Sequence, residues 1–271
     1  MKTRIISAAV LLPILLAIVL AAPKIVTAIL FGVMAALGAY ELLYNTGLVR
    51  HHRLVVYAMV AAFFVSLWSY YGAAHTLAIL GVLLYAGVLF GEMMASHVKM
   101  TFDKMAMCLA AGLLVPYLLT SFVRIHTMAS GRHFVLIPCV LAMLSDTGAY
   151  FTGRAIGRHK LAPVISPNKT IEGVVGGVVC AVLGMLLYSL ILGVGFKFNV
   201  NYGYAVLYGI LGAAVGTFGD LCFSVIKRQT GIKDYGNLIP GHGGILDRFD
   251  SMIFVAPLVE ALLLMLPVAV V

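Results

Sequence analysis

Apolar residues occur in long runs along almost the whole chain, and short polar connections separate these runs. A helix needs about 20 mostly apolar residues to cross the hydrocarbon core of a bilayer. Windows of that length lie at approximately 5–22, 25–44, 54–72, 77–95, 105–123, 134–152, 173–195, 204–225 and 252–270. The pattern therefore predicts an all-α polytopic membrane protein with about nine transmembrane helices.

The first apolar run has some features of a signal peptide. It follows Lys2 and Arg4, and alanines that resemble a cleavage site come before Pro23. We favour a retained first span, because the apolar core is long and a second hydrophobic segment follows almost at once.

The composition agrees with a membrane protein. Hydrophobic residues make up 62% of the chain and charged residues 10%, whereas about 25% is usual in soluble domains. The formal net charge of +8 indicates loops that face anionic lipids or substrates, and no basic, aromatic-rich surface suggests nucleic-acid binding. The four cysteines stand alone without C-x-x-C spacing, so neither a zinc site nor a disulfide framework is predicted.

The distribution of Lys and Arg predicts the orientation. Fourteen of these 18 residues fall at the amino end or in the loops after the second, fourth, sixth and eighth spans. By the positive-inside rule the amino terminus is cytoplasmic, and nine spans place Val271 outside. The two longest polar loops, 145–172 and 220–250, are then both cytoplasmic, where nucleoside triphosphates and Mg²⁺ are found.

Loop 220–250 concentrates charge. It holds four acids and four cations, which are Asp220, Asp234, Asp247, Asp250, Lys227, Arg228, Lys233 and Arg248. A carboxylate at the end of a span is costly unless it is paired, metal-bound or hydrated, so Asp146 and Asp220 are candidates for a functional site. Carboxylates with cations and a glycine-rich turn are typical of a metal ion held on a phosphate chain.

The spacing in this loop predicts shared faces. If the eighth span continues as a helix, one face carries Asp220, Ser224, Lys227 and Arg228. The glycines of the turn 240–244 allow successive N–H groups to point at one anion. Asp247 and Asp250 are three residues apart, so at the start of the last span we expect them on one side of a helical turn. Two such carboxylates repel unless a divalent cation lies nearby.

Loop 145–172 predicts a second anion site. Ser166 and Pro167 fit the N-cap and first position of a new helix. A helix N-terminus binds phosphate, and a cation such as Lys169 in the first turn is best explained by an anion there. A basic juxtamembrane loop with a capped helix is the alternative.

Each of these features also has an ordinary interpretation. The GHGG sequence alone is typical of a turn, and His242 is then only a turn residue. Asp247 and Asp250 can cap the last span, and Lys227 and Arg228 can contact lipid head groups. Their joint occurrence in one loop favours the functional interpretation.

The motif from Ser224 to Asp250 resembles a family signature. It reads S-x-I-K-R-x4-K-D-x-G-x2-I-P-x-H-G-G-I-x-D-R-F-D and is similar to that of the phosphatidate cytidylyltransferases, or CDP-diacylglycerol synthases. The first loop resembles a second block of the family in Asp146, Gly148 to Tyr150, Gly153-Arg154, and Ser166 to Gly173. Ile171 and Asn168 depart from the residues common there. The resemblance covers the carboxyl-terminal half.

The resemblance implies the activity and its setting. The reaction would be CTP + phosphatidate → CDP-diacylglycerol + pyrophosphate, dependent on Mg²⁺, at the cytoplasmic face of the inner membrane and in a homodimer. We expect one membrane-embedded domain, with amino-terminal helices in 1–125 and a catalytic half in 134–271. A phosphate monoester has a second pKa near about 6, so the lipid phosphate is already nucleophilic and no general base is required.

The expected roles follow from this chemistry. Metal ligands would be Asp220, Asp247, Asp146 and Asp250. Catalytic cations and donors would be Lys227, Arg228, His242 and Arg248. Substrate contacts would come from Ser166, Lys169, Thr170, Ser224, Lys233, Gly241, Gly243 and Gly244.

Two other classes of protein compete with this interpretation: a transporter, and another lipid-phosphate enzyme such as a lipid kinase or a CDP-alcohol phosphotransferase. A transporter of an anionic substrate also has many spans with acids at their edges. Transporters place polar groups near the bilayer midplane, however, whereas here they cluster in loops on one predicted side. The D-G-x2-A-R block of CDP-alcohol phosphotransferases and the G-x4-G-K-[ST] loop of many kinases are both absent from the sequence.

Overall fold

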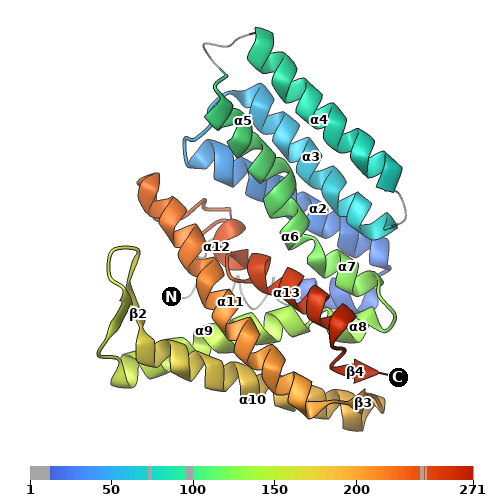
Figure 1. The fold of residues 1–271 in the computed structure, drawn as a ribbon, viewed down its shortest axis with the longest axis vertical. Coiled ribbons are helices and arrows are strands. Elements are labelled where there is room, and N and C mark those ends of the chain that lie inside the picture. The colour runs from blue at the N-terminus through green and yellow to red at the C-terminus, as the bar shows by residue number, and fades with distance from the viewer. Residues whose placement is uncertain (1–12, 73–74, 96–99, 239–240, 242, 271) are drawn as a thin grey trace. The chain divides into compact units, whose positions relative to one another are not determined.

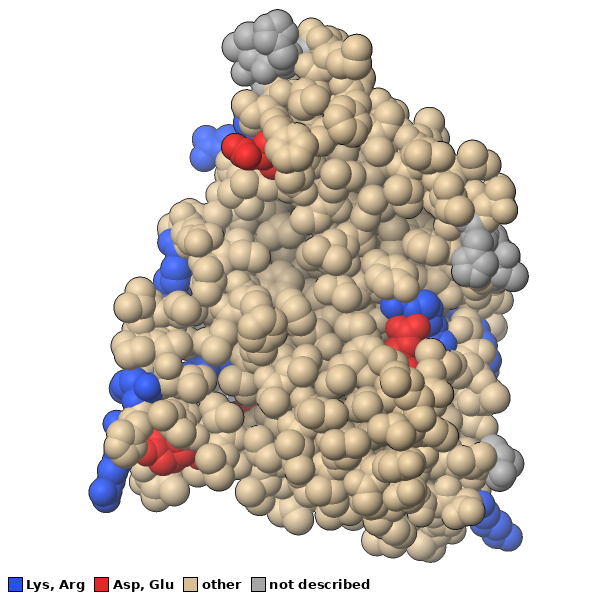
Figure 2. Space-filling model, in the orientation of Figure 1, with Lys and Arg blue, Asp and Glu red and all other residues tan. Residues whose placement is uncertain are grey.

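The computed structural model describes residues 13–72, 75–95, 100–238, 241 and 243–270. Helices account for nearly all of the regular structure, as the all-α prediction requires (Figure 1). Large apolar side chains are exposed on them: Leu84 is 71% exposed and Val194 is 75% exposed. Exposed apolar helices of this length need lipid around them. Most of the face in Figure 2 is uncharged, which agrees with this environment.

Seven helices are long and apolar enough to cross a membrane. They are Lys24–Asn45, His52–Tyr71, Thr76–Ala95, Phe102–Thr127, Gly131–Ile156, Ile171–Phe196 and Tyr202–Gln229. These helices match the second to eighth predicted spans. Of the first predicted span, the described part is helical over 13–21, and the rest lies outside the described residues. The predicted number of nine is therefore not confirmed.

The last predicted span is shorter than expected. The helix that begins at Met252 ends at Met265, and a short strand follows at Ala269–Val270. Its 14 residues rise about 21 Å, less than the hydrocarbon core of about 30 Å. The helix stops here because Pro267 disfavours a helical conformation at Leu266.

The chain divides into two compact units, and the first contains residues 1–129 and 229–249. Its elements are α2 (Lys24–Tyr40), the π-helical turn η1 (Glu41–Asn45), α3 (His52–Tyr71), α4 (His75–Ala95), α5 (Phe102–Leu109), η2 (Ala110–Leu114), α6 (Val115–Leu119), α7 (Ser121–Thr127) and α12 (Leu246–Phe249).

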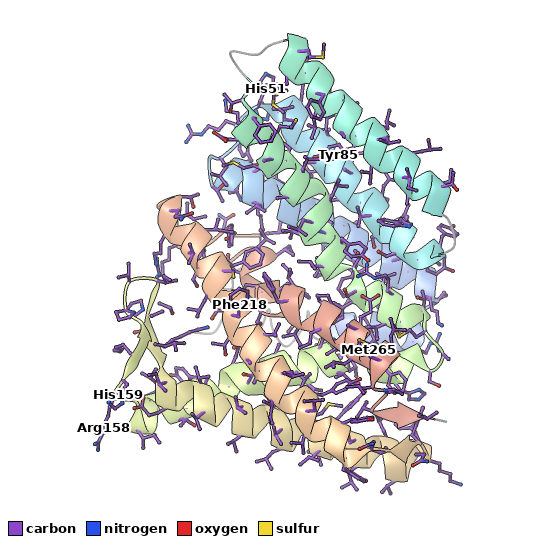
Figure 3. The ribbon with its side chains drawn as sticks, viewed as in Figure 1. His51, Tyr85, Arg158, His159, Phe218 and Met265 are labelled. Carbon is purple, nitrogen blue, oxygen red and sulfur yellow. The ribbon has the colours of Figure 1, made fainter. Side chains whose placement is uncertain are left out.

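Hydrogen bonds join these helices. Ser66 of α3 donates to the Ala28 carbonyl at 2.7 Å, and Tyr85 of α4 donates to the Cys108 carbonyl at 2.7 Å; Tyr85 is labelled in Figure 3.

An aromatic cluster holds the late segment 229–249 on the early helices of this unit. The rings of Phe31 and Phe122 stack with centroids 5.0 Å apart. Phe249 of α12 packs edge-on against both, at 6.3 and 6.4 Å. Aromatic pairs in these arrangements are stabilising beyond the area that they bury. Residues at the end of the predicted catalytic half therefore pack with amino-terminal helices.

The second unit contains residues 130–228 and 250–271. Its elements are α8 (Gly131–Phe134), α9 (Ile137–Ile156), β1 (Lys160–Ala162), β2 (Ser166–Thr170), α10 (Ile171–Phe196), β3 (Asn199–Val200), α11 (Tyr202–Gln229), α13 (Met252–Met265) and β4 (Ala269–Val270). Helices α9 and α10 run side by side (Figure 1). β1 and β2 form an antiparallel hairpin with Lys160 opposite Thr170, and β3 pairs antiparallel with β4.

The hairpin corrects one prediction. Ser166 and Pro167 do not begin a helix, because they lie in β2 and Ser166 is opposite Ala162 of β1. The helix begins at Ile171, and its N-cap is Thr170, whose Oγ1 accepts the Gly173 N–H at 3.1 Å. Lys169 is consequently a strand residue and not part of a first helical turn.

Candidate functional site

Asp220 is the centre of a charged cluster in the second unit. Helix α11 continues unbroken to Gln229, as the spacing of polar residues predicts. Ser224, one turn later, donates to Asp220 Oδ1 at 3.3 Å. The ammonium group of Lys169 forms an ion pair with Asp220 Oδ2. One carboxylate thus joins α11 to the hairpin.

Two further carboxylates are close to Asp220. Burial raises the pKa of Asp250, and so do the charges of Asp220 and Asp146, whereas the charge of Lys227 lowers it. The side chain of Ser251 lies near Asp146. The structure therefore brings together acids from α9, from α11 and from the turn before α13. Crowded carboxylates of this kind are stabilised by cations.

The hairpin that presents Lys169 is fixed at its base. Glu172 accepts the backbone N–H groups of Arg158 and His159 at 3.1 and 3.2 Å. Its Oε1 also lies 2.6 Å from Nδ1 of His159. Figure 3 shows Arg158 and His159 at the outer end of the hairpin base. On the side of α11, Arg228 Nε donates to the Ile165 carbonyl in the hairpin turn at 3.2 Å.

The acids of this cluster suit a partly hydrated Mg²⁺. Among the described residues, no three Asp, Glu, His or Cys side chains form a group that could hold a metal by themselves. Mg²⁺ is usually bound by one or two carboxylates together with waters and substrate phosphates. Asp220 and its neighbours Asp146 and Asp250 fit that kind of incomplete site, and their role as metal ligands stays a prediction.

Asp247 belongs to the first unit and anchors its own loop. It is only 7% exposed. Its Oδ2 accepts the backbone N–H of Tyr235 at 2.7 Å and that of Gly244 at 2.9 Å. Carboxylates that accept backbone donors form stronger hydrogen bonds than neutral acceptors. Asp247 therefore links Tyr235 to Gly244, which lies just before α12.

Asp247 and Asp250 do not share a helical turn, so that prediction is wrong. Helix α12 ends at Phe249, and α13 begins at Met252. Between them, Asp250 Oδ1 accepts the Ser251 N–H at 2.8 Å. This local hydrogen bond is an alternative to continuous helix for the backbone. The two acids also fall in different units.

Glu41 is a buried acid that the sequence analysis overlooked. It is 3% exposed and lies in the π-helical turn η1 of the first unit. Its two oxygens accept the backbone N–H groups of Ile245 and Leu246, each at 2.9 Å. Asn45, in the same turn, donates to the Tyr235 carbonyl at 2.8 Å. Its position inside the predicted span 25–44 could have indicated a functional role, because ionisable residues within spans are usually functional.

The glycines of the loop make room for these carboxylates. Gly243 has φ +85°, and a Cβ on it would lie 2.7 Å from Asp247 Oδ2. A Cβ on Gly244 would collide with the Glu41 carboxylate. The N–H of Gly244, predicted to bind a leaving group, donates to Asp247. The backbone of the loop thus approaches two anionic side chains of the protein itself, and binding of a substrate phosphate by these glycines stays a prediction.

The other candidate residues are distributed over both units. In the first, Lys233, Gly241 and Arg248 are exposed, and His242 lies outside the described residues. In the second, Arg228 is exposed, Lys227 and Ser166 are partly buried, and Thr170 is buried as the N-cap of α10.

The fold and these clusters define a polytopic helical membrane protein whose acids and lysines are gathered where helices end. The chain belongs to the cytidylyltransferase family, whose model matches residues 2–266. A phosphatidate cytidylyltransferase of Staphylococcus haemolyticus (strain JCSC1435) is 35% identical over 267 residues, which cover 97% of this chain and 99% of that protein. The one from Staphylococcus epidermidis (strain RP62A) is 34% identical over the same length, with the same coverage. That of Staphylococcus aureus (strain COL) is 42% identical over 170 residues, 61% of this chain and 62% of that protein.

Proposed function

We propose that this protein transfers the cytidylyl group of CTP to phosphatidate, for phospholipid biosynthesis. A phosphate oxygen of phosphatidate forms a bond to the α-phosphorus of CTP, and the bond from that phosphorus to the pyrophosphate oxygen breaks. The products are CDP-diacylglycerol and pyrophosphate. The observation that carries the proposal is the nearly full-length similarity to phosphatidate cytidylyltransferases, at 34–35% identity.

The charged clusters suit this reaction. Both substrates are polyanions, so the protein must overcome their repulsion and align them. Lys169 and Lys227 lie beside the carboxylates of the second unit, where they would offset phosphate charge as it shifts to pyrophosphate. Since the lipid phosphate already carries the nucleophilic charge, a proton acceptor is not required of any residue.

We also propose that Mg²⁺ takes part, held in the second unit by Asp220 with Asp146 and Asp250. For Asp247, in the first unit, metal binding stays a prediction. When bound, the ion would supply positive charge to the triphosphate. The hard carboxylate oxygens and the repulsion among crowded acids support this proposal.

Removal of divalent cations is expected to abolish activity and to leave the protein folded. EDTA should lower turnover at least about 100-fold, because a bound metal contributes several kcal/mol of charge stabilisation. Added Mg²⁺ should restore it. Binding of Mn²⁺ as a probe, followed by electron paramagnetic resonance, gives a readout that does not depend on turnover. Full activity after exhaustive chelation, or no Mn²⁺ binding, would contradict a metal-dependent reaction.

The topology that we propose places the amino terminus and the loops 145–172 and 220–250 in the cytoplasm, with the protein in the inner membrane. The excess of Lys and Arg in these loops supports it. The carboxyl terminus is proposed to lie outside, and the resemblance to the family supports a homodimer. Labelling of a cysteine introduced at exposed Lys233, in inverted vesicles but not in intact cells, tests the orientation.

Radiolabelled CTP tests the function directly. Purified protein is incubated with [α-³²P]CTP, phosphatidate and Mg²⁺, and the mixture is extracted with organic solvent. We expect label in the lipid phase that depends on phosphatidate, with one pyrophosphate released for each lipid labelled. Absence of lipid label from folded protein would overturn the proposed function.

A further inference from the structure

We infer that Glu41 is a positioning residue, which holds the backbone directly before Asp247 so that Asp247 and the adjacent Arg248 are correctly presented to the substrates. This inference rests on the proposed function. It assigns to the amino-terminal helices a part in catalysis that their mostly apolar sequence does not by itself suggest.

The contacts of Glu41 are directed at this stretch of backbone. Three consecutive N–H groups, those of residues 244, 245 and 246, donate to buried carboxylates. Asp247 accepts the first of them, and Glu41 accepts the second and third with separate oxygens. Glu41 is 204 residues away from Ile245 in sequence. The start of α12 is therefore fixed by contacts with η1, which is remote in sequence, and not by its own sequence alone.

The π-helical turn η1 also contacts Tyr235, on the other side of the loop. Asn45 donates to the carbonyl of Tyr235, whose N–H donates to Asp247. A π-helical turn is an irregularity that often marks a functional site. Here it carries both Glu41 and Asn45. Two side chains from η1 and one from α12 thus hold Tyr235 and residues 244–246, directly before Asp247 and Arg248.

The energetics favour positioning over simple packing. A buried carboxylate is costly to desolvate, and well-packed apolar residues often stabilise a protein equally well or better. What an apolar residue cannot do is accept two specific N–H groups. Glycines at two neighbouring positions also leave room for the Glu41 carboxylate. A Cβ on Gly236 would lie 2.9 Å from its Oε1, and a Cβ on Gly244 would collide with it.

Glu41→Gln is the sharpest variant. Glutamine has nearly the same shape, but only one oxygen to accept a hydrogen bond, and its NH₂ group would face the second N–H. We expect kcat to fall about 10–100-fold, as for other residues that orient ligands of a reactive centre. KM for CTP should change much less, and thermal unfolding in detergent should occur at a moderately lower temperature, because one buried N–H loses its acceptor. Glu92→Gln, which changes an acid of α4 in the same unit, is the matched control and should keep wild-type kcat.

Limited trypsin digestion distinguishes positioning from general destabilisation. Arg248 follows Asp247 in the first unit, and Arg158 lies in the second unit, so their cleavage rates report on different places. In Glu41→Gln we expect faster cleavage after Arg248 and unchanged cleavage after Arg158. Equal acceleration at both sites would mean that Glu41 has only a structural role, and the inference would be overturned.

The remaining outcomes are also decisive. Wild-type kcat in a folded Glu41→Gln protein would overturn the inference and leave the proposed function intact. If neither the wild type nor Glu92→Gln labels lipid, the proposed function itself fails. Should Glu41→Gln not fold, Asn45→Asp replaces the donor to Tyr235 on the other side of the loop. It should show the same loss of kcat and the same selective cleavage, and a normal result in both measurements would refute the inference.

Discussion

Asp220→Asn is expected to lower kcat for CDP-diacylglycerol formation by about 10²–10³-fold, the usual effect of removing one electrostatic contact from a reacting centre. Asparagine keeps the shape of the side chain but removes its charge. Lys169 then loses the partner of its ion pair, and a proposed metal ligand becomes neutral. The measurement is phosphatidate-dependent transfer of label from [α-³²P]CTP to lipid, at saturating CTP and at several Mg²⁺ concentrations.

The control for this variant is Asp103→Asn, which makes the same change at an exposed acid of α5 in the first unit. It should keep wild-type turnover. If Asp220→Asn shifts the activity toward higher Mg²⁺ concentrations, the charge acts through the metal. Turnover within a few-fold of wild type at all Mg²⁺ concentrations would remove Asp220 from the active site.

Asp247→Asn is expected to lower kcat by about 10²-fold with little loss of stability. The prediction depends on which atoms of Asp247 make its backbone contacts. A single oxygen, Oδ2, accepts both the Tyr235 and the Gly244 N–H. The amide oxygen of asparagine can occupy that position and keep both hydrogen bonds. The substitution therefore removes the negative charge and keeps an acceptor for these two N–H groups.

Asp247→Ala separates the two roles of this residue. It removes the charge and also leaves two buried N–H groups without an acceptor, which costs about 1–3 kcal/mol for each group. We expect it to unfold at a lower temperature than Asp247→Asn, with activity as low or lower. Near wild-type turnover of Asp247→Asn, with loss only in Asp247→Ala, would show that Asp247 anchors the loop and does not bind metal.

The sequence was sufficient to predict seven long apolar helices and to single out two acids that lie close together in the second unit. Seven apolar windows correspond to long helices because the bilayer imposes a minimum length that composition reveals. Asp146 and Asp220 stand out because charge is rare at the end of an apolar run. The polar face of α11 could also be predicted, since a helix places residues four apart on the same side.

The errors arose where tertiary contacts decide between local alternatives. Ser166 and Pro167 have the sequence of a helix start, but pairing with β1 makes them a strand, and Thr170 is the cap. Glu41 was missed because nothing local in the glycine-rich loop shows that a carboxylate from another helix lies beside Gly236 and Gly244. A contact across about 200 residues leaves no periodic pattern in the sequence.

The aromatic packing of Phe249 against Phe31 and Phe122 limits how this chain can be recombined with its relatives. A hybrid with a single crossover near residue 130 would place a foreign 229–249 segment on helices selected for another ring cluster. Exchange of residues 1–129 together with 229–249 preserves these native partners. Any exchange of the amino-terminal helices must therefore include the segment 229–249.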